Sequence, residues 1–187
     1  MRVFVAVGLG ERVANELWQA IEPVRSGGYP IRWLRPNGIH LTLKFVGEVE
    51  SSRELQIANA LDEAAGRSQP FRLKIVKFGG FPSLSFPRVV WAGCEMADTL
   101  GLLQRDIESQ LKQLGFPAEH RPFKPHITLG RAKKSSHKNS FNGLGDTMSK
   151  ITFTAASEIR TVELMLSELS SQGARHTALH SSALGAK

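Results

Sequence analysis

The chain of 187 residues is 41% hydrophobic and 22% charged and has a formal net charge of +7, as is typical of a soluble globular protein. No segment approaches the roughly 20 apolar residues of a membrane-spanning helix, residues 1–8 are too short an apolar stretch for a secretory signal peptide, and the single cysteine, Cys94, excludes a disulfide framework or a thiolate metal cluster. We therefore expect a cytoplasmic protein whose positive charge either favours polyanions such as nucleic acid or serves solubility alone.

Hydrophobic periodicity predicts strands and helices in alternation along the chain. In order, we expect a strand at 2–8, a helix at 11–25, a short strand at 31–34, a turn at 36–38, a strand at 39–46, a helix to about 65 that follows a capping box at 51–54, a strand at 71–78, a loop at 79–82, a strand at 88–94 and a helix at 98–114. The segment 132–149 is rich in Ser, Asn and Lys and predicts a mobile or disordered loop. The last strands are expected at 151–154, 158–168 and about 175–181.

One short motif occurs twice, each time in a predicted strand. His40-Leu41-Thr42-Leu43 returns as His126-Ile127-Thr128-Leu129, 86 positions later (126 − 40). Because successive side chains of a strand point to opposite faces, the His and Thr of each copy share one face and the aliphatic residues point into a core. Two such strands would bring two imidazoles and two hydroxyls to one cleft.

The repeat extends beyond the motif in the same gap-free register. Arg2–Ala6 aligns with Arg88–Ala92, Leu17 with Leu103, Ile21 with Ile107 and Pro36 with Pro122. Each half therefore predicts a strand, a helix, a connection and a histidine strand. We expect a single domain over residues 1–187 with an internal pseudo-repeat of about 2–46 and 88–131, in which an approximate two-fold axis places the motifs on either side of a central cleft.

The four polar motif residues suit the hydrolysis of a phosphodiester. Histidine has an ordinary pKa of about 6.5, so one neutral imidazole can act as base while one imidazolium acts as acid. The hydroxyls of Thr42 and Thr128 can donate hydrogen bonds to non-bridging phosphate oxygens, although threonine is also a common strand residue. Arg131, at the end of the second motif strand, can clamp a phosphate. This chemistry requires neither a metal nor a cofactor.

Other residues are open to more than one interpretation. Lys44 alternates with His40 and Thr42, and we expect it at a solvated strand end. Trp33 and Phe45 either stack on a base or pack in the core. His176 and His180 have no carboxylate or thiolate nearby in the sequence that would complete a metal site, and we expect no metal there. A basic run after the second motif either brings positive charge to one rim of the cleft or forms a solvated loop; it comprises Arg131, Lys133, Lys134 and Lys138.

Three blocks of the sequence resemble the 2H phosphoesterase superfamily, and most closely the bacterial and archaeal RNA 2′,3′-cyclic phosphodiesterases, once called 2′-5′ RNA ligases. The blocks are Asn37–Val49, Gly80–Pro82 with Pro87–Gly93, and Phe123–Arg131. The resemblance covers nearly the whole chain. One departure is Gly173-Ala174-Arg175-His176, which lies where the family usually has a tyrosine.

The resemblance implies a bilobal α+β fold with antiparallel sheets around a central cleft and helices on the outside. It also implies metal-independent hydrolysis of RNA 2′,3′-cyclic phosphate ends to 2′-phosphomonoesters. His40 would be the proton donor to the leaving 3′-oxygen and His126 the proton acceptor that activates water, while Thr42, Thr128 and Arg131 would hold the phosphate. On sequence grounds alone, the pseudo-symmetry leaves the two histidines interchangeable.

Two alternative functions remain open. One is a phosphodiesterase or RNA ligase acting on 2′-5′-linked oligonucleotides, and the other is a non-catalytic module that binds RNA ends. The intact His and Thr of both motifs argue against a pure binder, which needs no matched proton donor and acceptor. In each case the expected partners are RNA ends or cyclic nucleotides, with no membrane, and we expect a monomer.

Overall fold

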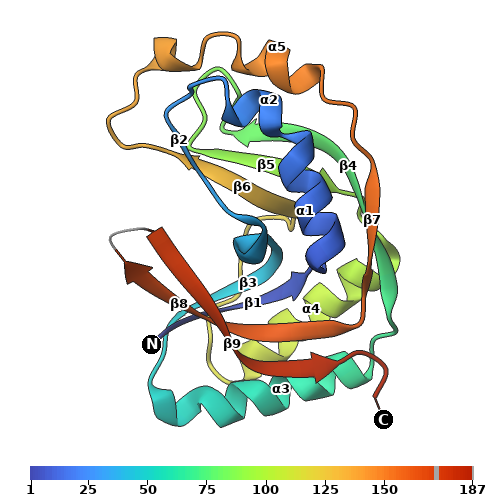
Figure 1. Cartoon of the computed structure of the whole chain (residues 1–187). Coiled ribbons are helices and arrows are strands. Elements are labelled where there is room, and N and C mark those ends of the chain that lie inside the picture. Colours follow the sequence, from blue (N-terminus) through green and yellow to red (C-terminus); the bar gives the residue numbers. More distant parts are fainter. Residues whose placement is uncertain (171–172, 187) are drawn as a thin grey trace.

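The protein has the predicted α+β fold, built on one antiparallel sheet (Figure 1). The computed structural model describes residues 1–170 and 173–186. Its strands are β1 (Arg2–Gly8), β2 (Ile31–Trp33), β3 (His40–Glu48), β4 (Phe71–Phe81), β5 (Val89–Cys94), β6 (His126–Ala132), β7 (Ala155–Ile159), β8 (Thr161–Ser170) and β9 (Gly173–Ala183). Its helices are α1 (Glu11–Ala20), α2 (Glu22–Arg25), α3 (Glu54–Gly66), α4 (Asp98–Gln113) and α5 (Leu144–Ser149).

The two histidine strands are neighbours in the middle of the sheet. Eight of the nine strands run in the order β7-β4-β5-β6-β3-β1-β8-β9, and the ninth, β2, pairs with β6 beside this path. Strands β3 and β6 are joined by a single ladder pair, Leu41 with Ile127. The sequence β5-β6-β3-β1 is symmetrical about this junction, since β1 pairs with β3 as β5 pairs with β6. The assignment of one domain with an internal repeat stays a prediction.

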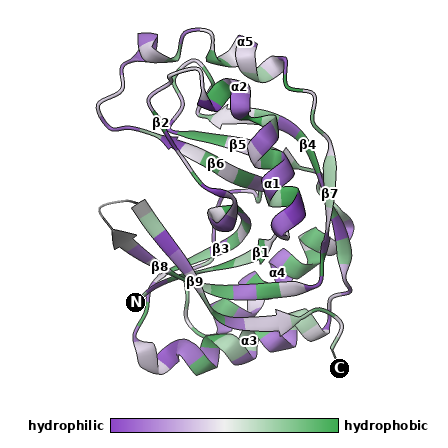
Figure 2. Ribbon diagram, in the orientation of Figure 1, coloured by the Kyte–Doolittle hydropathy of each residue, from purple (hydrophilic) through white to green (hydrophobic). Residues whose placement is uncertain are grey.

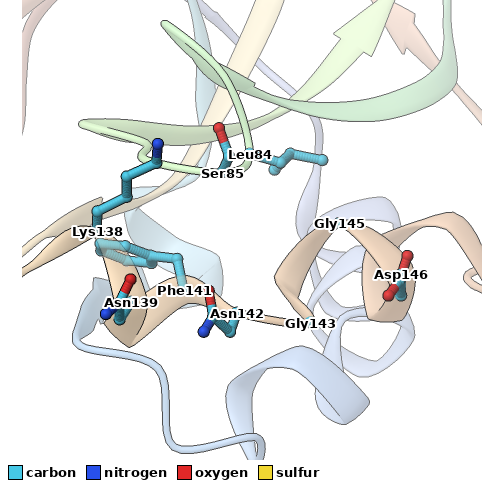
Figure 3. A pocket seen from close by; sticks show the side chains of 9 residues that line it. All are labelled: Leu84, Ser85, Lys138, Asn139, Phe141, Asn142, Gly143, Gly145 and Asp146. Carbon is cyan, nitrogen blue, oxygen red and sulfur yellow. The ribbon is translucent and has the colours of Figure 1, made fainter.

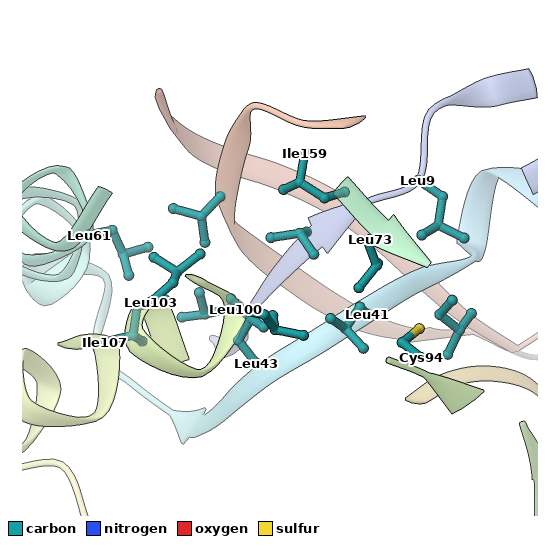
Figure 4. Close-up of a cluster of buried hydrophobic side chains, with 14 of the residues drawn as sticks. Leu9, Leu41, Leu43, Leu61, Leu73, Cys94, Leu100, Leu103, Ile107 and Ile159 are labelled. Carbon is teal, nitrogen blue, oxygen red and sulfur yellow. The ribbon is translucent and has the colours of Figure 1, made fainter. Parts of the chain in front are cut away.

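The main core lies on the side of the sheet that the aliphatic residues of both motifs face. Leu41 and Ile127 are fully buried there. Figure 4 shows Leu41 in this core together with Leu100, Leu103 and Ile107 of α4. Burying each such side chain contributes on the order of 1.5–3 kcal/mol. Figure 2 shows hydrophobic and hydrophilic residues alternating along the helices, as expected for helices with one face on a core. Within the described residues, none of the helices has both the length and the hydropathy that crossing a membrane requires.

Several predicted boundaries are wrong for identifiable reasons. The helix expected at 11–25 breaks at Ile21 into α1 and α2, because Pro23 has no N–H to donate and fits the first turn of a new helix. The expected capping box does not form, because Ser51 lies in a 3₁₀ turn and no side chain caps α3. Strand β4 continues through the expected loop at 79–82 as far as Phe81, paired with β5.

The C-terminal part of the chain also departs from the prediction. Residues 151–154 form no strand, and the next strand begins at Ala155. The expected mobile loop at 132–149 is wrong as well, because it contains a 3₁₀ turn (Lys138–Phe141) and α5. Phe141, Leu144 and Met148 anchor this segment in a second buried cluster with Val24, Ile31 and Val90.

Candidate functional site

The four motif residues lie on one face of the sheet, which we call the histidine face. Because β3 and β6 are antiparallel and Leu41 pairs with Ile127, the register sets His40 opposite Thr128 and Thr42 opposite His126. All four residues are partly exposed, whereas the aliphatic motif residues between and after them are buried. The structure therefore brings together the two histidines and two threonines that the sequence singled out.

A β-bulge lies at the last residue of each motif and changes which of the following residues share this face. In β3 the register with β1 skips Leu43, and in β6 the register with β5 skips Leu129. An extra residue in a strand moves the side chains that follow it to the opposite face of the sheet. Lys44 is consequently buried, at 5% exposure, and the prediction of a solvated strand end is wrong. The second bulge turns Arg131 onto the histidine face.

Backbone carbonyls two residues earlier orient both imidazoles. Nδ1 of His126 lies 2.7 Å from the carbonyl oxygen of Lys124. Since a carbonyl only accepts, this contact requires the proton on Nδ1 and leaves Nε2 of neutral His126 free to take a proton. The ring of His40 likewise hydrogen-bonds to the backbone of Gly38. The repeated motif thus extends to the way each histidine is held.

His40 lies in an aromatic environment that the sequence did not predict. Its ring stacks on Phe4 at a centroid distance of 4.9 Å and meets the edge of His176 at 5.1 Å. Burial, the neighbouring His176 and Arg131 lower the pKa of His40 to about 4, against the effect of the Gly38 hydrogen bond. Burial and Arg131 also lower the pKa of His176. His176, on β9, is thus a site residue that the sequence motif did not reveal.

His40 is therefore expected to be neutral in the free protein at neutral pH. Histidine-labelled protein, titrated by ¹⁵N NMR, should show a His40 midpoint near the lowered pKa of about 4. Adding inorganic phosphate should raise this midpoint, because a nearby negative charge favours the imidazolium. A midpoint at the ordinary value of 6.5, unmoved by phosphate, would contradict this description of the site. The His40→Gln variant assigns the resonance.

His126 has its own aromatic neighbour. Phe81 meets its ring edge-on at 5.1 Å and packs against Trp91. Trp33 and Phe45 are the two aromatic residues that the sequence offered for stacking on a base. Phe45 is 65% exposed and lies two positions after Leu43, the bulge residue of β3. Trp33 instead packs against both buried clusters, which is the core interpretation.

The threonine hydroxyls are available to a ligand. Neither Thr42 nor Thr128 hydrogen-bonds through its side chain to another group in residues 1–170 and 173–186. His180 makes a different contact from His176, because its Nε2 is 2.8 Å from a carboxylate oxygen of Asp62. Among the residues described, no group of three or more potential ligands is placed to hold a metal ion.

A separate hollow of about 240 Å³ lies between the β4–β5 hairpin and the segment 138–146 (Figure 3). Its lining includes Ser85, Lys138 and Asn142 but none of the motif residues. Lys138 therefore belongs to this hollow, while Lys133 and Lys134 of the same basic run are exposed just beyond β6.

Comparison with known proteins places this arrangement in a family. Residues 13–178 match the model of the 2′-5′ RNA ligase superfamily. The chain is 29% identical over 177 residues to an RNA 2′,3′-cyclic phosphodiesterase of Methanothermobacter thermautotrophicus, covering 95% of both chains. It is 35% identical over 133 residues to the protein of that name from Thermotoga maritima, covering 71% of each.

A solved structure is also similar over nearly the full length. The crystal structure of Escherichia coli LigT complexed with 3′-AMP superimposes with a TM-score of 0.77 and 26% identity, covering 98% of this chain and 97% of the other. Its ligand is a nucleoside monophosphate. The chain therefore belongs to the 2′-5′ RNA ligase superfamily, and the resemblance drawn from its paired His-x-Thr-Leu motifs is confirmed.

Proposed function

We propose that this protein hydrolyses RNA ends bearing a 2′,3′-cyclic phosphate to 2′-phosphomonoesters by acid–base catalysis with two histidines. The observation that carries this proposal is the pairing register of β3 and β6, which sets each histidine opposite the threonine of the other motif. A phosphate bound where β3 meets β6 lies on the same face of the sheet as two imidazoles and two hydroxyl donors. Relatives named RNA 2′,3′-cyclic phosphodiesterase support the choice of substrate.

His126 accepts the proton of the attacking water in this mechanism. The Lys124 carbonyl holds the Nδ1 proton, so Nε2 carries the lone pair that a general base needs. As water attacks phosphorus, its proton passes to Nε2 of His126. Thr42 and Thr128 donate hydrogen bonds to the non-bridging oxygens, where negative charge must be stabilised in the transition state.

His40 donates its proton to the 3′-oxygen as the P–O3′ bond breaks. The free protein keeps this histidine neutral because its pKa is lowered to about 4, so the anionic substrate has to favour its protonation. An imidazolium that burial and positive neighbours destabilise is a strong acid toward an alkoxide. Arg131 lies on the same face and binds the phosphate. The cycle closes when the proton returns from His126 to His40 through solvent.

Phosphorus NMR on a 2′,3′-cyclic nucleotide in excess EDTA tests this function. We expect conversion to the 2′-monophosphate alone, because the 3′-oxygen is the leaving group. Formation of the 3′-monophosphate would contradict the assigned regiochemistry. An intact cyclic ester in EDTA that is hydrolysed when divalent metal is restored would contradict catalysis by the two histidines alone. No hydrolysis in either condition would contradict the function itself.

A further inference from the structure

Two arginines lie directly opposite each other at the border of the histidine face. Strand β2 pairs antiparallel with the end of β6, and the register sets Arg32 across from Arg131. The residues on either side of Arg32 point to the protein interior, since Ile31 is 5% exposed and Trp33 packs against both buried clusters. Arg32 therefore projects on the same side as Arg131.

Neither guanidinium has an acidic partner. Both side chains are exposed, and no ion pair formed within residues 1–170 and 173–186 includes Arg32 or Arg131. Like charges directly opposite each other on paired strands destabilise the pair. An anion between the two side chains would remove this repulsion, and two guanidinium forks match the oxygens of a phosphate.

A third cation continues the same row. The backbone N–H of Lys133 donates to the carbonyl of Pro30 at 2.8 Å, so the pairing of the two segments extends past Arg131. Lys133 follows Arg131 by two residues, which places its side chain on the same side about 6.6 Å farther along. It is exposed. The row begins at the reacting phosphate, because Arg131 acts electrostatically on His40, and leads away from it.

We propose that Arg32, together with Arg131, binds a second phosphate of the substrate, the internucleotide phosphate adjacent to the reacting end. The protein then selects the ends of RNA strands over free cyclic mononucleotides, which lack this phosphate. This inference rests on the proposed function for its reacting end. Arg131 serves both phosphates because it lies between the histidines and Arg32, and Lys133 extends the path for the preceding nucleotide.

The test compares a substrate that carries the second phosphate with one that lacks it. We would measure kcat/KM for a tetranucleotide ending in a 2′,3′-cyclic phosphate and for the corresponding cyclic mononucleotide. In Arg32→Ala, the ratio of tetranucleotide to mononucleotide kcat/KM should fall by about tenfold, as expected for one charged hydrogen-bonded contact. Arg72→Ala is the matched control, because it removes an exposed strand arginine from β4, and its ratio should equal that of the wild type.

A binding measurement separates this inference from the proposed catalysis. Fluorescence anisotropy of a labelled tetranucleotide ending in a 2′-phosphate needs no turnover. The slope of log affinity against log salt should become shallower by about one in Arg32→Ala. An unchanged ratio and an unchanged salt slope would overturn the second-phosphate site. Equal losses on both substrates would also overturn it, by placing Arg32 at the reacting end. If the wild type hydrolyses neither substrate, the proposed function fails while the salt slope still decides the role of Arg32.

Discussion

Replacing His40 or His126 by alanine is expected to lower kcat/KM for a 2′,3′-cyclic nucleotide by about 10²–10⁴-fold, because each side chain performs one positioned proton transfer. Both residues are partly exposed on the histidine face, with their aliphatic neighbours forming the core, so the fold should be retained. The double variant should lose little more than the more damaged single variant, because residues that act as a unit are not additive. Steady-state kinetics, with thermal unfolding as a control for folding, measures both effects.

A substrate with an activated leaving group distinguishes the two roles. A nucleoside 2′-(p-nitrophenyl phosphate) releases p-nitrophenolate, which leaves without a proton. His40→Ala should hydrolyse this ester nearly as well as the wild type, whereas His126→Ala should stay impaired because its water is not activated. The opposite pattern would exchange the roles of donor and acceptor. A single variant that keeps full activity on the cyclic substrate would refute the two-histidine mechanism.

Replacing Lys44 by alanine is expected to lower the free energy of unfolding by about 3–5 kcal/mol, because it leaves a largely buried charge without its partner. The Lys44 side chain is 3% exposed and its Nζ lies 2.7 Å from a carboxylate oxygen of Glu108, itself 18% exposed. The same ammonium donates to the carbonyl of Pro117 at 2.8 Å. It therefore ties β3 to the segment that leads from α4 to His126. Urea denaturation followed by circular dichroism measures the loss.

An exposed ion pair between the end of α3 and α4, the helix that also contains Glu108, provides the control. Arg67 and Asp106 are 50% and 40% exposed and 3.4 Å apart, so Arg67→Ala should cost less than about 1 kcal/mol. The double variant Lys44→Met with Glu108→Leu should recover much of the stability lost in Lys44→Ala, because hydrophobic residues can replace a buried pair. Equal losses for Lys44→Ala and Arg67→Ala would show that burial does not strengthen the Lys44 interaction.

The parts of the fold that strict periodicity encodes were predictable. Both motif strands and the long helix α4 follow simple alternation or helical spacing, and each lies within a few residues of its expected range. The segment 132–149 was wrongly predicted to be a mobile loop because its composition is polar. Its three buried apolar residues, Phe141, Leu144 and Met148, are three and four positions apart. This spacing is typical of the buried face of a helix, and it was the evidence for structure in this polar segment.

The candidate site was predictable only as far as alternation holds. A bulge inserts one residue without leaving a mark in the sequence, so Lys44 was assigned to the wrong face and the orientation of Arg131 was undetermined. His176 belongs to β9, yet it contacts His40 and Phe4. Such contacts depend on the twist and pairing of strands far apart in the chain, which single-sequence periodicity does not encode. The pair of Arg32 and Arg131 was hidden for the same reason.

The place of β1 in the sheet has a consequence for how the protein is made. Phe4 pairs with Phe45 on one side and with Met165 on the other. Because a chain is synthesised from its N-terminus, β1 can pair with β3 early, but its second partner, β8, emerges only after both histidine strands, β3 and β6. Until then β1 has an open edge, and an open edge is a template for pairing with other chains. The late strand β8 therefore protects the nascent protein from self-association as well as completing its core.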